Sequence, residues 1–145
     1  MQRRKTIMRA VANTRHAWGN HVKQLTLAAG IPDSYRTVLL FLTRNPGSSQ
    51  RNIAEFAGVT TSAINQVVKN MLEEDFLRKE TDASDKRNTK LYLTEKGMQV
   101  AETLRQKLDA SDDAITALIG TEKEAELIAF LDKLADFIRK DLTQC

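Results

Sequence analysis

One stretch of the sequence carries amide, hydroxyl and ammonium groups that could all lie on one face of a helix. Between Thr61 and Glu74 the apolar residues recur three and four positions apart, so the polar residues between them must share the opposite face. Asn and Gln side chains can form paired hydrogen bonds with adenine, and Thr can contact the methyl group of thymine. No carboxylate interrupts this face before Glu73, so it can approach phosphate without repulsion. We therefore expect this face to read bases, and the alternative is a polar face that is merely solvated. The candidate base-reading face consists of Thr60, Thr61, Ser62, Asn65, Gln66 and Lys69.

A second charged cluster lies in the polar segment 82–89, between two stretches, 77–81 and 90–94, whose residue pattern predicts short strands. A guanidinium on a narrow hairpin tip fits an A/T-rich minor groove, where the negative potential is enhanced. We therefore expect Arg87 to enter a minor groove, and the alternative is a charged loop that is simply solvated. The cations expected near phosphate are Lys69, Lys86 and Lys90.

A hydroxyl residue and an amide residue begin a short predicted helix at 49–57. Ser48 or Ser49 can cap this helix, because a side-chain oxygen accepts a hydrogen bond from a free N–H group of the first turn. The same N–H groups, together with Ser49 and Gln50, could bind a phosphate. Capping alone is the equally open alternative for the serine.

The sequence contains no recognisable set of catalytic or metal-binding residues. His16 and His21 lie roughly 140° apart around a helix, so they do not form a joint metal-binding face. A Gly-rich phosphate loop, an HExxH pair and a nucleophile motif do not occur. The lone cysteine, Cys145, permits neither an intrachain disulfide nor a four-cysteine zinc site. We therefore expect neither an enzyme nor a bound cofactor or metal.

Charge is distributed unevenly along the 145 residues, whose formal net charge is +3. Residues 1–50 hold eight basic residues and one acidic residue, residues 51–100 hold eight of each, and residues 101–145 hold six basic and ten acidic residues. The basic N-terminal part suggests an anionic partner, although a solvated helix face would have the same composition. The longest apolar runs have five residues, where a membrane-spanning helix needs about 20, and no signal peptide is recognisable. We expect a cytoplasmic chain.

Glycine and proline divide the chain into helices that are joined by short turns. Gly58 falls where a tight turn requires a positive φ angle, which glycine adopts without strain. Thr60 or Thr61 can cap the helix after this turn, and Thr121 with Glu124 has the spacing of a capping box. The predicted helices span residues 3–28, 33–45, 49–57, 61–74, 94–119 and 122–142.

The last predicted helix has apolar residues at near-heptad spacing, which suits packing against another long helix. A domain this small has little core of its own to cover two long helices. We therefore expect this apolar stripe to contact a second chain, and ordinary core packing within one chain is the alternative. The stripe consists of Leu127, Phe130, Leu131, Leu134, Phe137 and Ile138.

The order of helix, tight turn, helix and two-stranded hairpin is the winged helix-turn-helix pattern, and residues 33–97 resemble the multiple-antibiotic-resistance regulator (MarR) family. The resemblance begins in the run 52–60 and continues through the helix that follows it. Its most specific parts are the Asp-Lys-Arg run 85–87 and the closing Leu-Thr-Glu-Lys-Gly run 93–97. The flanking helices match the family's layout in order and length, so the resemblance covers nearly the whole chain.

The resemblance implies a mostly α-helical fold with a small β-hairpin wing. It places a winged helix-turn-helix DNA-binding domain at 33–97 and helical dimerisation regions at 1–32 and 98–145. It also implies a homodimeric, DNA-binding transcriptional regulator, which we interpret as a repressor at a pseudo-palindromic operator. In this family a small effector or an oxidant often weakens DNA binding. Asp85 would then orient Arg87 by a charge-assisted hydrogen bond.

Two aromatic residues, Trp18 and Tyr35, lie at the junction where the family binds effectors, although filling space between helices is their more ordinary role. Cys145 stands at the terminus, unlike the family's redox-sensing cysteine in the first helix. The alternative function is a winged-helix interaction module that dimerises without binding DNA. The carboxylate-free helix face and the retained Arg87 argue against it.

Overall fold

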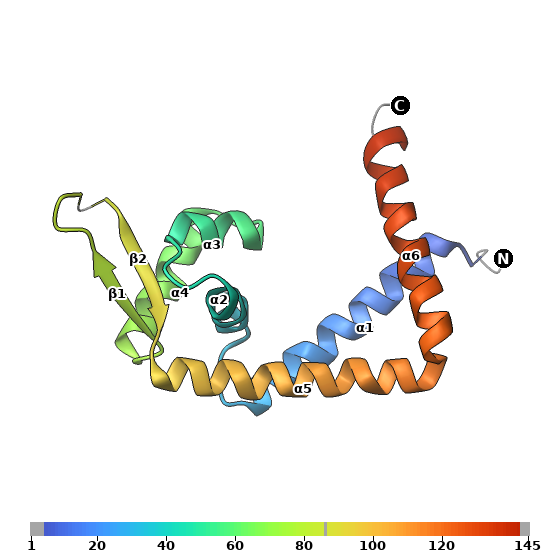
Figure 1. The fold of residues 1–145 in the computed structure, drawn as a ribbon, viewed down its shortest axis with the longest axis horizontal. Helices are drawn as coiled ribbons and strands as arrows, with labels where there is room; N and C mark the ends of the chain where they lie inside the picture. Colours follow the sequence, from blue (N-terminus) through green and yellow to red (C-terminus); the bar gives the residue numbers. More distant parts are fainter. Residues whose placement is uncertain (1–4, 86, 143–145) are drawn as a thin grey trace. The chain divides into compact units, whose positions relative to one another are not determined.

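The computed structural model describes residues 5–85 and 87–142. The chain divides into two compact units, residues 1–107 and 108–145, and the boundary lies within the helix 95–119. Two residues discussed above, Lys86 and Cys145, lie outside the described residues. In chain order (Figure 1), the elements are α1 (Ile7–Ala28), α2 (Asp33–Arg44), α3 (Gln50–Ala57), α4 (Thr61–Glu73), β1 (Leu77–Thr81), β2 (Thr89–Leu93), α5 (Glu95–Ile119), α6 (Thr121–Phe137) and the π-helical turn η1 (Ile138–Leu142).

The predicted fold class is confirmed, because helices dominate and the two strands form one antiparallel hairpin. The differences are small shifts of element ends. α1 begins at Ile7, since the Thr6 side chain caps it by accepting a hydrogen bond from the Arg9 N–H. Among the described residues, no helix combines the length and the apolar character that crossing a membrane requires.

Helix α2 lies at the centre of the first unit's core. Its residues Val38, Leu39 and Leu42 are at most 1% exposed. The predicted apolar face of α4 packs into the same core, where Ile64, Val68 and Met71 are buried and two further stripe residues are half-buried. Because this face is committed to the core, the polar face of α4 must point outward. The residues that complete the core are Ile31, Tyr35, Ile53, Ala54, Phe76, Leu77, Leu91 and Ala101.

A tight turn joins α3 to α4, as the sequence predicts. Gly58 caps α3 in the left-handed region at φ +67°, where a residue with a Cβ atom would be strained. The structure also selects between the pairs of candidate caps. Ser49 caps α3 in a reciprocal capping box with Asn52, and Thr60 caps α4 by accepting a hydrogen bond from the Ala63 N–H at 3.2 Å.

The two strands of the hairpin pair from Leu77 opposite Leu93 to Thr81 opposite Thr89. In Figure 1 the hairpin stands beside α3 and α4. The loop before α3 is joined to strand β2 by backbone hydrogen bonds. The Gly47 N–H donates to the Leu91 carbonyl at 2.9 Å, and the Leu91 N–H donates to the Ser48 carbonyl at 3.0 Å. Gly47 has φ +79°, and a Cβ atom there would lie 2.9 Å from the Tyr92 hydroxyl oxygen. The base of the hairpin is thus fixed to the segment that starts α3.

In the second unit, the predicted capping box at Thr121 is wrong. Gly120, at φ +84°, occupies the cap position and supplies no side chain, so Thr121 is already the first helical residue. The carboxylate of Glu124 instead accepts a hydrogen bond from the Thr116 hydroxyl. No residue of α6 is buried, and Phe130 is 54% exposed.

Candidate nucleic-acid interface

The polar face of α4 is exposed, as the sequence predicts. Thr61 and Ser62 are at the start of the helix, and Asn65 and Gln66 follow one turn later, with Lys69 beyond them. Thr60, which we also expected on this face, is exposed, but its hydroxyl already serves as the helix cap.

The two amides on this face differ in how freely they can bind a base. Gln66 Nε2 donates to the Asn70 side chain at 2.9 Å, which holds the Gln66 amide along the helix and leaves its carbonyl oxygen as an acceptor. The side-chain amide of Asn65 has no hydrogen-bond partner in the part of the chain that the structure describes. Asn70 was not identified from the sequence, although its position four residues after Gln66 is the spacing at which helical side chains meet.

The tip of the hairpin is organised by carboxylates that bind backbone N–H groups. Asp85 Oδ1 accepts a hydrogen bond from the backbone N–H of Arg87 at 3.0 Å. The charge-assisted hydrogen bond of Asp85 thus goes to the backbone of Arg87, whose side chain is exposed, and the role of Asp85 in orienting Arg87 stays a prediction. Asp82 likewise accepts hydrogen bonds from Ser84, and these hydrogen bonds hold the pKa of Asp82 below its usual range.

A hollow of about 460 Å³ lies between the start of α3 and the hairpin tip. The Ser49 hydroxyl is used within the capping box, where it donates to Asn52 Oδ1 at 2.8 Å. The backbone N–H groups of Gln50 and Arg51 have no acceptor among the described residues, so they remain free for an anion. Arg51 was not among the sequence candidates because it follows the cap by two positions and has no motif of its own. The hollow is lined by Ser49, Gln50, Arg51, Asp85, Arg87, Asn88 and Thr89.

Lys90 is the one sequence candidate of the hairpin that lies on a strand. Its side chain is exposed on β2, where it pairs across the hairpin with Glu80. It also lowers the pKa of Asp82, though by less than the Ser84 hydrogen bonds do. Lys90 is thus available to phosphate, within a hairpin of mixed charge.

The two aromatic residues expected near an effector do not form one site. Tyr35 is 2% exposed, its hydroxyl donates to Glu74 Oε1 at 2.8 Å, and its ring meets Phe76 edge-on. Burial, with a further contribution from the Glu74 hydrogen bond, raises the pKa of Tyr35 to about 12, so it stays a neutral donor. The Trp18 ring lies 5.6 Å from the His21 ring at a tilt of 42°, and Trp18 lines a groove along α1 that does not include Tyr35.

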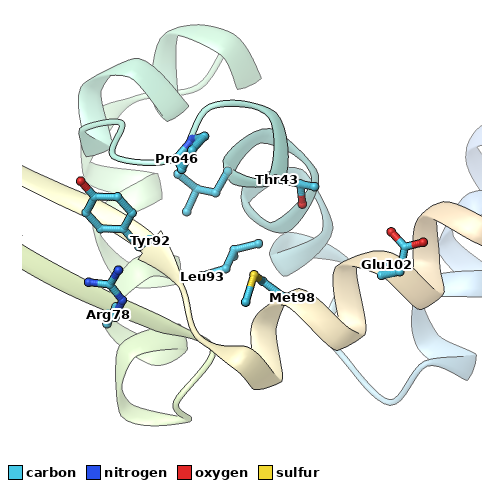
Figure 2. Close-up of a pocket in the computed structure, with 8 residues that line it drawn as sticks. Thr43, Pro46, Arg78, Tyr92, Leu93, Met98 and Glu102 are labelled. Atoms are coloured by element: carbon cyan, nitrogen blue, oxygen red, sulfur yellow. The ribbon is translucent and has the colours of Figure 1, made fainter.

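A different cavity, which sequence reasoning did not identify, lies at the base of the hairpin (Figure 2). It has a volume of about 440 Å³ and combines apolar walls with charged groups at its edge. The guanidinium carbon of Arg78 lies 4.5 Å from the centre of the Tyr92 ring. Its lining residues are Leu42, Thr43, Pro46, Arg78, Tyr92, Leu93, Met98 and Glu102.

The described part of the chain contains no group of three or more His, Cys, Asp or Glu side chains that could hold a metal ion. What the geometry offers is an exposed amide and hydroxyl face on α4, a hairpin tip that exposes Arg87, and free N–H groups between them.

Comparisons with known proteins identify a family model, a curated relative and solved structures that this chain resembles. Residues 29–88 match the model of the MarR family. The HTH-type transcriptional regulator PetP of Rhodobacter capsulatus is 28% identical over 64 residues, which cover 44% of this chain and 39% of PetP. The chain thus matches about two fifths of that relative's length.

Two solved structures show the same fold over nearly the whole chain. A MarR family transcription regulator is similar with a TM-score of 0.85 at 18% identity, covering 95% of this chain and 93% of that chain. The complex of Staphylococcus aureus MepR with DNA is similar with a TM-score of 0.76, also at 18% identity, covering 93% of this chain and 99% of that chain. The fold is therefore the winged helix-turn-helix.

Proposed function

We propose that this chain is a MarR family transcriptional regulator that binds double-stranded DNA as a homodimer and represses transcription at a pseudo-palindromic operator. The names of its relatives support the proposal, since PetP is a transcriptional regulator and MepR was solved bound to DNA. The observation that carries it is the outward face of α4, called the recognition helix from here on. This face is exposed and free of carboxylates up to Glu73, and the buried residues behind it fix its direction.

In the proposed complex, the recognition helix lies in the major groove, where the edges of all four base pairs can be told apart. Arg87 enters the neighbouring minor groove, and the free N–H groups of Gln50 and Arg51 bind the phosphate backbone between the two grooves. Phosphate contacts fix the position of the protein, whereas Asn65 and Gln66 read the bases.

Exposed apolar residues at both ends of the chain support a homodimer. Ile7 of α1 is 60% exposed and Leu118 of α5 is 83% exposed, and the α6 residues Leu127, Phe130 and Phe137 are about half exposed. Large apolar side chains that a chain leaves exposed in such numbers are typical of surfaces that contact another protein chain. A two-fold dimer presents two identical recognition helices, which is why we propose an operator with two related half-sites.

The proposal is tested by titrating labelled duplex DNA with the chain at several salt concentrations. We define the selected duplex as the one that the wild-type chain enriches from a random pool, and the scrambled duplex as its base-shuffled form. DNA binding predicts a steep fall of affinity with salt, because bound lysines and arginines release counterions. An interaction module that only dimerises would enrich no sequence and would show no such salt dependence.

Release by a small-molecule effector stays a prediction, and the cavity at the base of the hairpin supports it. Its walls come from α2, from both strands and from the start of α5, so a bound molecule would touch the elements that support the wing. We propose this cavity as the effector site in place of a site at Trp18 and Tyr35, because Tyr35 is buried and already hydrogen-bonded.

The hairpin tip gives a prediction whose sign is informative. Arg87→Ala should weaken binding to the selected duplex and reduce the slope of log affinity against log salt by about 1–2 for the dimer, since each wing loses one cation. Asp85→Ala should also weaken binding, although it removes a negative charge, because the Arg87 N–H loses its acceptor.

Asp85→Asn is the matched control, because its amide oxygen can still accept that hydrogen bond without the charge. Fluorescence anisotropy with the selected duplex compares the variants. If Asp85→Ala binds more tightly than the wild type, Asp85 acts only as a repulsive charge and its shaping role is refuted.

A further inference from the structure

The Leu-Thr-Glu-Lys-Gly run that closes the hairpin is absent from the proposed DNA-facing surface, yet it binds the end of the recognition helix. Lys96 Nζ donates to the carbonyl oxygen of Glu74 at 2.7 Å. Thr94 donates twice, from Oγ1 to the Asp75 carbonyl at 2.6 Å and from its backbone N–H to the Phe76 carbonyl at 3.1 Å. Three successive carbonyls that follow α4 are thus satisfied by the segment that starts α5.

These carbonyls lie where the chain must leave α4 sharply. Asp75 is at φ +61°, the one non-glycine residue with positive φ in the described part of the chain. The last carbonyl groups of a helix lack partners within it, and a cation placed there interacts favourably with the helix dipole. Lys96 supplies that cation, and its Nζ also lies 4.2 Å from the centre of the Phe76 ring.

The start of α5 is fixed to the same point. Thr94 Oγ1 accepts a hydrogen bond from the Gly97 N–H at 3.1 Å, so one hydroxyl serves both the end of α4 and the start of α5. Gly97 packs so closely that a Cβ atom there would lie 2.2 Å from the Phe76 carbonyl oxygen. A shift of α4 against α5 would break these contacts together.

We infer that Thr94 and Lys96 are positioning residues, which hold the C-terminal end of the recognition helix against α5 and so set how its outward face meets the bases. The inference rests on the proposed function, since it concerns the same DNA-binding surface. Paired hydrogen bonds to a base edge tolerate little displacement, whereas attraction to phosphate tolerates more. Loss of this tie should therefore lower sequence-specific affinity more than non-specific affinity.

A competing explanation is that Lys96 itself contacts phosphate, and Thr94 separates the two. Thr94→Val keeps the shape of the side chain, changes no charge and removes only the hydroxyl that joins Asp75 to Gly97. Lys96→Met removes the ammonium and keeps an apolar stem over Phe76. Lys96→Arg keeps a donor that can reach the Glu74 carbonyl, and Lys79→Met is the control for loss of an exposed lysine on the neighbouring strand.

Each full-length variant is titrated with the selected and the scrambled duplex at one salt concentration, and hydrogen–deuterium exchange is followed on residues 71–76 without DNA. Loss of one hydrogen bond corresponds to about fivefold in affinity. We expect Thr94→Val and Lys96→Met to lose at least about this factor on the selected duplex, and to keep the wild-type affinity for the scrambled duplex. Both should exchange faster at residues 71–76, whereas Lys96→Arg and Lys79→Met should match the wild type.

Equal losses on both duplexes for Lys96→Met, with Thr94→Val unchanged, would show that Lys96 is a phosphate contact and would overturn the inference. Wild-type exchange and affinities in both variants would overturn it as well, while leaving the proposed function intact. A wild-type chain that binds neither duplex would refute the proposed function and, with it, this role.

Discussion

Replacing Asn65 with alanine should weaken binding to the selected duplex roughly tenfold or more, while affinity for the scrambled duplex stays nearly unchanged. The side-chain amide of Asn65 is exposed and has no hydrogen-bond partner in the described part of the chain, so it is free to pair with a base. Its neighbours Ile64 and Val68 are buried, which prevents the helix from rolling without exposing apolar area. A lost paired contact costs about 1–3 kcal/mol in each half-site, and two independent half-sites would double it.

Two further variants of the same helix complete this test. Gln66→Ala should show the same selective loss as Asn65→Ala, and Asn70→Ala should show a smaller one, since it frees the Gln66 amide. Lys69→Ala should weaken binding to both duplexes, because a phosphate contact carries no information about the base. The measurement is competition between the two duplexes at one fixed salt concentration. If both amide variants lose affinity for the two duplexes in equal proportion, this face does not read bases.

Placing a charge in the apolar stripe of α6 should separate the proposed dimer into monomers. Phe130 belongs to this stripe and is 54% exposed, so Phe130→Asp would put a carboxylate into the expected interface. Because the two recognition helices would no longer be linked, affinity for the selected duplex should fall by about a hundredfold or more. Deletion of residues 122–145 should likewise leave monomers or aggregates. Sedimentation velocity measures the mass, and anisotropy measures the affinity.

Ala129→Asp is the matched control for this variant. It adds the same charge one residue away, at an exposed position off the stripe, and should remain dimeric. A well-folded dimer of either Phe130→Asp or the truncated chain would contradict the proposed role of α6.

Most elements of the fold follow from patterns that are local in the sequence. Gly58 marks the turn because only a residue without Cβ takes φ +67° easily, and the buried residues of α4 repeat at helical spacing. The prediction that Thr121 caps α6 was wrong, and the reason is again local in the sequence. Gly120 also lacks a side chain and can hold the cap position itself at φ +84°, and the sequence does not say which residue will do so.

The candidate site was predictable where a periodic pattern fixes a direction, and less so where partners are distant in the chain. The outward face of α4 follows from its period alone. The Tyr35 hydroxyl, by contrast, finds Glu74 39 residues away, and the Arg78 guanidinium finds the ring of Tyr92 on the opposite strand. Such pairings depend on tertiary packing, which a single sequence does not display, so the cavity beside Arg78 could not have been inferred.

Helix α6 has no buried residue, and this has a thermodynamic consequence. A helix whose apolar side finds cover only in a partner gains that part of its stability by mass action. We therefore expect the midpoint of thermal unfolding to rise with protein concentration, by the equivalent of about 1.4 kcal/mol per mole of dimer for each tenfold increase. Dilution would then lower the fraction of the chain that is folded as well as the fraction that is bound to DNA. The copy number of the chain would itself act as a control on how much working regulator a cell contains.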